Sequence, residues 1–511
     1  MADNTKIWPI FRWANGGLSD DLFTGIKNSF YYSNDMEIRE DAKSVFPKPV
    51  PAYADLTKSI QVWDASSYEH NVVCATYSNT EHWWLVCTEW SIYLVEDDWT
   101  VTKLCTFVSS SEQASDVICD MEVFNGYVYV STRTHLFYKK DEWEQPSRWT
   151  GMAEATDDTA QNYWRCTQVL QNNWWHPLYA TDVKLCIWDT NTMWYITNEV
   201  YKDLDEWFVL QTWYYIRFIT ELWWFVRAVA TNDPYGSEVL LWDKVSDAPS
   251  EIIPLEWYSI IQATIYNWYL YLLSNKGLWL LNWYQYYLLK KVEWDVDTTT
   301  KNWMCVYDDK LYFIANDWIY IYWAKNKNYA DVLNLWHKVE DWYKLWAIWS
   351  YKNWIMITRG WKNVAWWWTD EKIRVWINDW QATTWEVQTM CYFGTSMSEI
   401  KQSAYLRVWY HLWKTSTESW DIHIYYRTEA DATDDDPENW AWHPAQANDV
   451  WLSATWDMRS PFATTIKLNC RFQWIQFKFV VTNCVYTDNW TTKTKDTNLY
   501  SADLYYNTML D

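Results

Sequence analysis

Alternating apolar and polar residues recur along the middle of the chain, and several of these runs directly follow a turn signal. The segment Phe124–Val130 contains Asn-Gly followed by alternating β formers, which is typical of a β-hairpin. Tyr266–Leu272 and Lys352–Ile357 repeat this pattern, with tryptophan where the first copy has glycine. The pattern therefore predicts a series of short antiparallel hairpins.

The hairpins form a repeat of about 45 residues. A second strand-like run follows several of them, as at Ser91–Leu94 and Glu238–Leu241. Four short strands in about 40 to 50 residues are typical of a β-propeller blade, because each small sheet needs neighbours to cover its faces. We predict about seven blades; the alternatives are a β-solenoid, whose repeats are shorter, and a row of small sandwiches, whose units are longer. The aligned turn positions are Trp83, Gly126, Trp174, Trp223, Trp268, Lys310 and Trp354.

The repeat ends near Cys391, and longer alternating strands follow. Asp421–Arg427 and Phe472–Val481 are examples, and their period of two predicts the half-buried strands of a β-sandwich. The first residues differ from both regions and end in the proline-rich connector Phe46–Pro51. The predicted fold is all-β, with an N-terminal extended arm at residues 1–57, a β-propeller at 58–395 and a β-sandwich at 396–511.

The ratio of tryptophan to glycine is reversed from that of ordinary proteins. The chain has 48 tryptophans and 9 glycines, whereas glycine usually makes up about 7% of residues. Trp268 and Trp354 align with a turn position that needs positive φ, which costs a bulky residue roughly 1–2 kcal/mol. We interpret many tryptophans as glycines of a genome that reads UGA as glycine, with Trp474 as a plausible genuine strand tryptophan. The alternative is a Trp-rich carbohydrate binder, and exposed side chains with positive φ at these turn positions would favour recoding.

The net charge and the length of the apolar runs indicate which classes of partner the chain does not bind. A formal net charge of −24 argues against a broad basic face for nucleic acid or anionic lipid. No run of 18 apolar residues appears, and residues 1–6 lack the apolar stretch of a signal peptide. We therefore expect no nucleic acid partner, no membrane insertion and no cleaved leader.

No residue pattern indicates catalysis or a cofactor. Ten dispersed cysteines indicate buried free thiols, and eight dispersed histidines indicate structural or solvated roles. Asp308-Asp309 reads as a turn, and Asp434-Asp435-Asp436-Pro437-Glu438 reads as a solvated hairpin tip in preference to a Ca²⁺ site. Tyr214-Tyr215 and Tyr286-Tyr287 are expected to pack within blades. We predict no catalytic, cofactor-binding or metal residues, while a glycosidase carboxylate pair stays open as an alternative.

The N-terminal arm carries the elements of a known family. Asn15–Asp20 contains Gly-Gly-Leu, Gly25–Phe30 a Gly-Ser-Phe-like element, and Met36–Arg39 an Asp-Ile-Arg-like element. This order resembles the opening of a group of tailed-phage virion proteins in which these elements precede a propeller. Asn28 and Glu37 depart from the pattern. The strands Phe472–Val481 and Leu499–Tyr506 look similar to the end of a phage tail or appendage sandwich.

The resemblance implies a structural virion protein of a tailed phage, in the tail or an appendage, assembled in the host cytoplasm and not an enzyme. Its implied partners are other virion proteins and a host surface glycan or protein, with a symmetric homo-oligomer as an option. The alternatives are a glycan-binding or glycan-hydrolysing propeller protein and a host repeat protein unrelated to virions.

Overall fold

The computed structural model describes most of the strands and many of the turns of the chain. The predicted strand at residues 175–179 and the turns at 125–126 and 352–353 lie outside the described residues. The described residues are 5–11, 18–19, 22–23, 29–38, 45–47, 50–55, 72–78, 83–88, 91–95, 101–106, 118–124, 127–132, 136–139, 147–148, 166–170, 184–188, 193–197, 200–203, 215–222, 225–232, 236–242, 249–256, 258–282, 284–292, 302–323, 332–339, 343–351, 354–361, 374–380, 384–394, 396–411, 421–445, 462–482, 485–488, 491–494 and 498–508.

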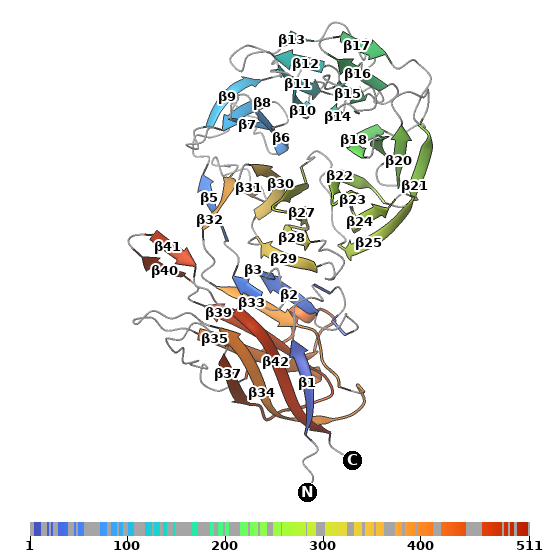
Figure 1. Cartoon of the computed structure of the whole chain (residues 1–511). Coiled ribbons are helices and arrows are strands. Elements are labelled where there is room, and N and C mark those ends of the chain that lie inside the picture. The colour runs from blue at the N-terminus through green and yellow to red at the C-terminus, as the bar shows by residue number, and fades with distance from the viewer. Residues whose placement is uncertain are drawn as a thin grey trace. The chain divides into compact units, whose positions relative to one another are not determined.

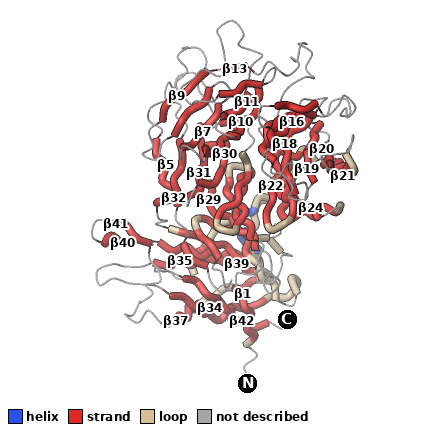
Figure 2. Tube along the Cα trace, turned by 45° about the horizontal axis from the view of Figure 1, so that its top comes forward, coloured by secondary structure: helices blue, strands red, loops and turns tan. Residues whose placement is uncertain are grey.

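The described chain divides into two compact units, residues 1–52, 318–338 and 378–511, and residues 53–317 and 339–377. Strands make up nearly all of the described secondary structure (Figures 1 and 2), beside the single 3-10 turns η3 (Glu429–Asp431) and η4 (Pro437–Asn439). No helix in the described part of the chain is long and apolar enough to cross a membrane.

Seven four-stranded antiparallel sheets follow one another along the described chain, and we call them blades 1 to 7. In blades 1 to 6 the strands pair in chain order, whereas blade 7 takes its fourth strand from the N-terminal part of the chain. The strands of blades 1 to 3 are β6 (Val72–Ser78), β7 (Trp83–Thr88), β8 (Ser91–Val95) and β9 (Val101–Thr106); β10 (Ile118–Phe124), β11 (Tyr127–Thr132), β12 (Leu136–Lys139) and β13 (Ser147–Arg148); and β14 (Cys166–Leu170), β15 (Lys184–Trp188), β16 (Met193–Thr197) and β17 (Val200–Asp203). The strands of blades 4 to 7 are β18 (Tyr215–Leu222), β19 (Phe225–Asn232), β20 (Gly236–Trp242) and β21 (Glu251–Glu256); β22 (Ile260–Tyr266), β23 (Tyr269–Ser274), β24 (Gly277–Asn282) and β25 (Gln285–Lys291); β26 (Met304–Tyr307), β27 (Lys310–Ala315), β28 (Trp318–Trp323) and β29 (Val332–Lys338); and β30 (Tyr343–Tyr351), β31 (Trp354–Trp361), β32 (Arg374–Trp380) and β5 (Val50–Asp55).

The blades close into a ring. Successive first strands lie against one another in the order β6, β10, β14, β18, β22, β26 and β30, and β30 in turn lies against β6. Apolar residues of neighbouring blades share one core, as where Val239 and Leu255 of blade 4 cluster with Leu270 and Trp279 of blade 5. The strand order and the closed ring confirm the predicted seven-bladed propeller.

Polar side chains of the first strands tie blade to blade. The register shifts beside Arg217 in β18 and beside Ile261 in β22, at the same level of both strands. Arg217 Nε donates to the carbonyl of Ile261 at 3.1 Å, and Gln262 Nε2 donates to the carbonyl of Met304 in blade 6 at 3.0 Å. Buried groups that would otherwise lose their hydrogen bonds to water thus link three consecutive blades.

Two-residue turns join the strands where the sequence predicts hairpins. Asn267 and Trp268 have φ of 46° and 68°, and Asp308 and Asp309 have φ of 48° and 54°, as a type I′ turn requires. The aligned turn positions need correction at three places, because Trp83 pairs with Ser78, Lys310 pairs with Tyr307 and Trp354 pairs with Tyr351. These residues, Trp83, Lys310 and Trp354, are therefore the first residues of β7, β27 and β31.

The C-terminal sandwich packs two sheets that contain strands from both ends of the chain. The seven-stranded sheet has the order β3-β4-β42-β34-β37, with β1 paired to β42 and β38 paired to β34, and the five-stranded sheet has the order β2-β33-β39-β35-β36. Residues predicted from the sequence as an extended arm thus form β1 to β4 of the two sandwich sheets. The domain boundaries at residues 57/58 and 395/396 stay a prediction. The strands are β1 (Lys6–Phe11), β2 (Phe30–Asn34), β3 (Met36–Ile38), β4 (Val45–Pro47), β33 (Trp385–Thr389), β34 (Lys401–His411), β35 (Asp421–Thr428), β36 (His443–Pro444), β37 (Phe462–Lys467), β38 (Arg471–Phe472), β39 (Ile475–Thr482) and β42 (Asn498–Thr508), and a separate hairpin contains β40 (Val485–Asp488) and β41 (Thr491–Thr494).

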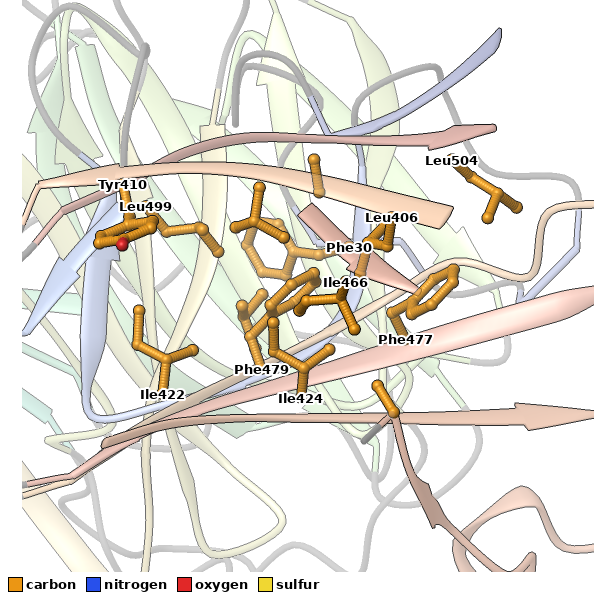
Figure 3. Packing of buried hydrophobic residues seen from close by; sticks show 14 of the residues in the cluster. Phe30, Leu406, Tyr410, Ile422, Ile424, Ile466, Phe477, Phe479, Leu499 and Leu504 are labelled. Atoms are coloured by element: carbon orange, nitrogen blue, oxygen red, sulfur yellow. The ribbon is translucent and has the colours of Figure 1, made fainter. Parts of the chain in front are cut away.

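Alternation along the strands produces the sandwich core. In β39 the residues Ile475, Phe477, Phe479 and Val481 are buried, at every second position. They meet residues of the other sheet such as Leu406, within the core shown in Figure 3. Burying one such side chain stabilises the fold by roughly 1.5–3 kcal/mol.

Candidate binding surface

The last strand of blade 5 exposes an unusual number of large apolar side chains. Tyr284, Tyr286, Tyr287 and Leu288 are 54%, 40%, 47% and 43% exposed, and no described strand pairs with the outer side of β25. Ile252 on β21, the last strand of blade 4, is 48% exposed. We call these five residues the blade-rim surface (β21 and β25 in Figure 1).

Packing beneath the blade-rim surface holds its side chains in place. Trp279 of β24 is buried, and its ring makes edge contacts with Tyr258 at 4.5 Å and Tyr286 at 5.8 Å between centroids. The Tyr287 hydroxyl donates to Gln285 Oε1 at 2.5 Å. Two of the exposed tyrosines therefore have fixed contacts, which lowers the entropy cost of presenting them to a partner.

Charged groups lie at the blade 4 end of the blade-rim surface. The Tyr284 hydroxyl forms a hydrogen bond with the Glu251 carboxylate, and this bond raises the pKa of Tyr284. Arg227 is buried beside this pair, and burial lowers its pKa while Tyr284 and Glu251 act in the opposite direction. Blades 4 and 5 are thus connected where Ile252 and Tyr284 are exposed.

Lysines lie at the other end of β25. Lys290 is 8% exposed and burial lowers its pKa to about 8, while Lys291 is exposed. The register with β24 shifts between Leu288 and Lys290, which marks a β-bulge. Lysines and β-bulges on an edge strand hinder its pairing with another strand. In β25 both features lie at the C-terminal end, and the residues before them lack this protection.

The last strand of blade 6 shows a different arrangement, because the N-terminal segment covers β29. Leu18 N donates to the carbonyl of Leu333 at 2.7 Å, and Asp35 N donates to the carbonyl of Trp336 at 2.6 Å. The Ser33 hydroxyl reaches the carbonyl of Leu335 at 2.7 Å. Carbonyl groups of β29 thus accept hydrogen bonds from the N-terminal segment of the same chain.

Buried side chains fasten this cover. Asn334 accepts a hydrogen bond from the Ser33 hydroxyl at 3.1 Å and donates to the carbonyl of Met36 at 2.7 Å. Asp35, with φ of 56°, pairs with His337 Nδ1 at 2.6 Å. Asp and Asn tolerate positive φ better than most residues, so an aspartate suits this turn between β2 and β3.

The acidic run at 434–438 uses its carboxylates within its own loop. Asp434 accepts hydrogen bonds from Asp436 N at 3.0 Å and Asn439 Nδ2 at 3.1 Å, and the bond from the Asp436 backbone lowers the pKa of Asp434. Asp436 Oδ1 accepts from Glu438 N at 2.9 Å at the start of η4. Among the described residues no group of three His, Cys, Asp or Glu is placed to hold a metal ion.

A buried arginine supports the same loop. Arg427 Nε donates to Gln476 Oε1 at 2.6 Å and Nη1 donates to the carbonyl of Pro437. Its guanidinium lies over the rings of Trp440 and Trp442 at 4.9 and 4.3 Å. The charge is satisfied by hydrogen bonds and aromatic faces, as a buried cation requires.

The other candidate residues are dispersed in the described structure. His337 pairs with Asp35, His443 pairs with Asp431 at 2.6 Å, and His423 lies in β35. His70, His82, His135 and His176 lie outside the described residues, and Tyr214 does as well. The described free thiols Cys87, Cys305 and Cys391 are buried and Cys470 is partly buried.

The expectation that Tyr286-Tyr287 pack within the blade holds only in part, because the Tyr286 ring contacts Trp279 while both side chains are substantially exposed. Sequence reasoning missed the blade-rim surface, although one signal was available. The run Tyr286-Tyr287-Leu288-Leu289 is apolar on both alternating faces, whereas a half-buried strand has one polar face.

Comparisons with known proteins give only distant likenesses. No protein-family model and no curated protein matches the sequence. The WD40 domain of Neurospora crassa Pan2 is 8% identical with a TM-score of 0.41, over 65% of this chain and 98% of that chain. The YCF48 of Cyanidioschyzon merolae is 8% identical with a TM-score of 0.38, over 60% and 95%. The WD40 domain of SCAP from fission yeast is 9% identical with a TM-score of 0.36, over 93% and 98%. The propeller assignment therefore rests on the strand order and the closed ring.

Proposed function

We propose that this chain is a structural virion protein of a tailed phage, which acts by binding through rigid surfaces and not by catalysis. The observation that carries the binding role is the blade-rim surface, where three exposed tyrosines of blade 5 lie beside exposed Ile252 of blade 4. Aromatic residues fixed on a rigid sheet are common anchors of protein interfaces. We propose that this surface attaches the chain to neighbouring subunits of the tail or appendage.

The virion role follows from the resemblance of the N-terminal elements, and part of that segment has a structural use. The Met36–Ile38 part of the third element is β3, and Asp35 beside it bonds to β29. A segment that pairs within a sandwich sheet and covers a blade edge fixes distant parts of the chain to each other, which suits a structural role. This use supports the proposal without identifying the particle.

The experiment is mass spectrometry of purified phage particles from the source culture. We expect peptides of this chain in the particle fraction at a fixed ratio to the major tail proteins. Presence in infected cells together with absence from gradient-purified particles would contradict the proposal. A variant with Tyr287→Lys and Leu288→Lys should fold and show reduced incorporation, while Met397→Lys, at another exposed apolar residue, should be incorporated normally.

We also propose UGA recoding, which is supported at the turn position Trp268 but not at Trp354, since Trp354 is the first residue of β31 and is not among the positive-φ residues of the described chain. Trp268 is 75% exposed with φ of 68°, a conformation that glycine adopts without strain. Not every tryptophan is expected to be a recoded glycine, because several tryptophan side chains are buried in the protein core. These are Trp279, Trp303, Trp336, Trp349, Trp385, Trp440 and Trp474. The same mass spectra read residue 268 directly: glycine supports recoding there, and tryptophan excludes it.

A glycan-binding propeller remains the second candidate because the blade-rim surface exposes two adjacent tyrosines on a sheet edge. Tyrosine rings present a flat apolar face with a polar tip, which suits the faces of sugar rings. A glycan array probed with the purified protein tests this candidate. Binding that is lost on Tyr286→Ala and Tyr287→Ala would favour it over attachment to virion subunits.

A further inference from the structure

The outer side of β25 combines three features that together select a partner. It belongs to the last strand of its sheet, the residues Tyr286 to Leu288 are apolar and exposed, and groups of opposite charge lie near its two ends. Glu251 lies at the Tyr284 end, and Lys291 lies at the other end. An exposed apolar edge strand is a template for pairing with another strand.

We propose that the partner at this edge is a second copy of the chain, whose β25 pairs antiparallel with the first around a two-fold axis near Tyr287. This inference rests on the proposed binding role of the blade-rim surface and names its occupant. In an antiparallel pair the lysine end of each strand lies beside the Tyr284 end of the other. Lys291 of each copy therefore comes close to Glu251 of its partner, so the contact is complementary in charge.

The apolar residues also match under this symmetry. With the axis at Tyr287, each Tyr286 lies opposite a Leu288, so an aromatic and an aliphatic side chain occupy facing positions of the antiparallel pair. Ile252 lies next to Glu251 and widens the contact onto blade 4. The C-terminal bulge and Lys290 limit the pairing to the first part of β25, which favours a dimer of defined register.

Sedimentation velocity on the purified full chain, from about 1 to about 50 μM, tests the proposal at concentrations where standard interfaces associate. The wild type should shift from monomer to dimer as concentration rises. Tyr287→Lys with Leu288→Lys should remain monomeric, because four lysines would meet at the axis, while the matched Met397→Lys should associate like the wild type. A monomeric wild type over the whole range, or a dimer unaffected by the double lysine change, would overturn the proposal.

Charge reversal tests the two-fold arrangement itself. Lys291→Glu alone and Glu251→Lys alone should each weaken association on the order of tenfold, because each places like charges together twice. An equimolar mixture of the two variants should regain association, since in the mixed dimer every facing pair is again of opposite sign. Circular dichroism of each variant checks the fold. If Glu251→Lys is unfolded, the single variant Lys291→Glu and the separate double variant Tyr287→Lys with Leu288→Lys still test whether β25 forms the dimer contact.

The outcome separates this inference from the proposed function. A monomer in solution whose incorporation into particles still depends on Tyr287 and Leu288 would overturn the second-copy partner only. A dimer with the expected variant effects, in a protein absent from particles, would overturn the virion role only.

Discussion

The last strands of blades 5 and 6 each have an outer side that no other strand of their own sheet pairs with, and the described part of the chain covers this side in blade 6 but not in blade 5. β29 is covered by residues of the N-terminal segment, which bond to its carbonyls and bury Asn334. β25 has no such cover among the described residues and exposes Tyr286, Tyr287 and Leu288. An exposed apolar edge is available for pairing with another chain, and the proposed dimer at β25 depends on this difference between the two edges. Substitutions at the two edges should therefore affect different properties.

The largest effect is expected at Asn334 on the covered edge. Asn334→Ala removes two hydrogen bonds and leaves the Met36 carbonyl and the Ser33 hydroxyl short of one partner. We expect the free energy of unfolding to fall by about 2–3 kcal/mol, because buried groups lose bonds that water cannot replace. Urea unfolding measures the change. Asn507→Ala, at an exposed position of β42, is the control and should change little; equal losses would contradict the role of the cover.

The second effect is expected at Lys290, the buried lysine at the end of the open edge. Burial holds its pKa at about 8, below the ordinary value of 10.5. Below pH 8 the lysine is protonated in the folded and unfolded chains and burial of the charge destabilises the fold. Between the two values only the unfolded chain binds the proton, so this penalty declines as pH rises.

Lys290→Met should therefore raise the free energy of unfolding by about 2 kcal/mol at pH 7. The gain should shrink between pH 8 and pH 10.5, and above pH 10.5 the wild-type lysine is neutral in both states. Urea unfolding at pH 7 and pH 10 measures it, with exposed Lys291→Met as the control. A gain of the same size at both pH values would assign the effect to methionine packing and not to charge.

The third effect is expected at the turn between β2 and β3. Asp35→Asn keeps a residue that tolerates positive φ but removes the charge that faces His337 at 2.6 Å. We expect a loss of about 1 kcal/mol, since the pair is only partly buried. Asp308→Asn, also at positive φ but in an exposed turn, is the matched control for urea unfolding. Equal effects of the two changes would mean that the pair with His337 adds nothing to the cover.

The sequence predicted the turns and blades because they depend on local residue patterns. It did not predict strand pairs between distant parts of the chain, because no local pattern encodes them. Asn267-Trp268 and Asp308-Asp309 form turns with positive φ, which Asn and Asp tolerate better than most residues, and the repeat of these turns predicts the blades. The errors at Lys310 and Trp354 are shifts of one residue, because alternating strands do not mark where a turn ends. The pairing of β1 with β42 joins residues at opposite ends of the chain, and no local pattern encodes it.

The candidate surface was harder to predict than the fold. Tyr286-Tyr287-Leu288 has the composition of a buried strand, so burial was the natural expectation. Exposure depends on position in the blade, because the first strand lies against the first strands of adjoining blades, whereas no described strand pairs with the outer side of β25. Residue type alone does not distinguish a core strand from a binding edge.

The smallest effect on stability is expected at the open edge itself. Tyr287→Lys with Leu288→Lys replaces side chains that are already nearly half exposed, and it leaves the contact between Tyr286 and Trp279 in place. At about 1 μM, below the expected range of association, the free energy of unfolding should therefore change by less than about 0.5 kcal/mol. Thermal unfolding followed by circular dichroism measures it in parallel with Asn334→Ala.

The comparison becomes sharper when protein concentration is varied. Association that favours the folded state raises its apparent stability with concentration, so the wild-type Tm should rise between about 1 and about 50 μM. The Tm of the Tyr287→Lys and Leu288→Lys variant should stay constant, while that of Asn334→Ala should be lower throughout and still rise, because β25 is intact. A large loss at 1 μM in the lysine variant would instead make Tyr287 and Leu288 part of the blade 5 core. The covered edge would then differ from the open one in degree only, since both would serve the stability of their own blade.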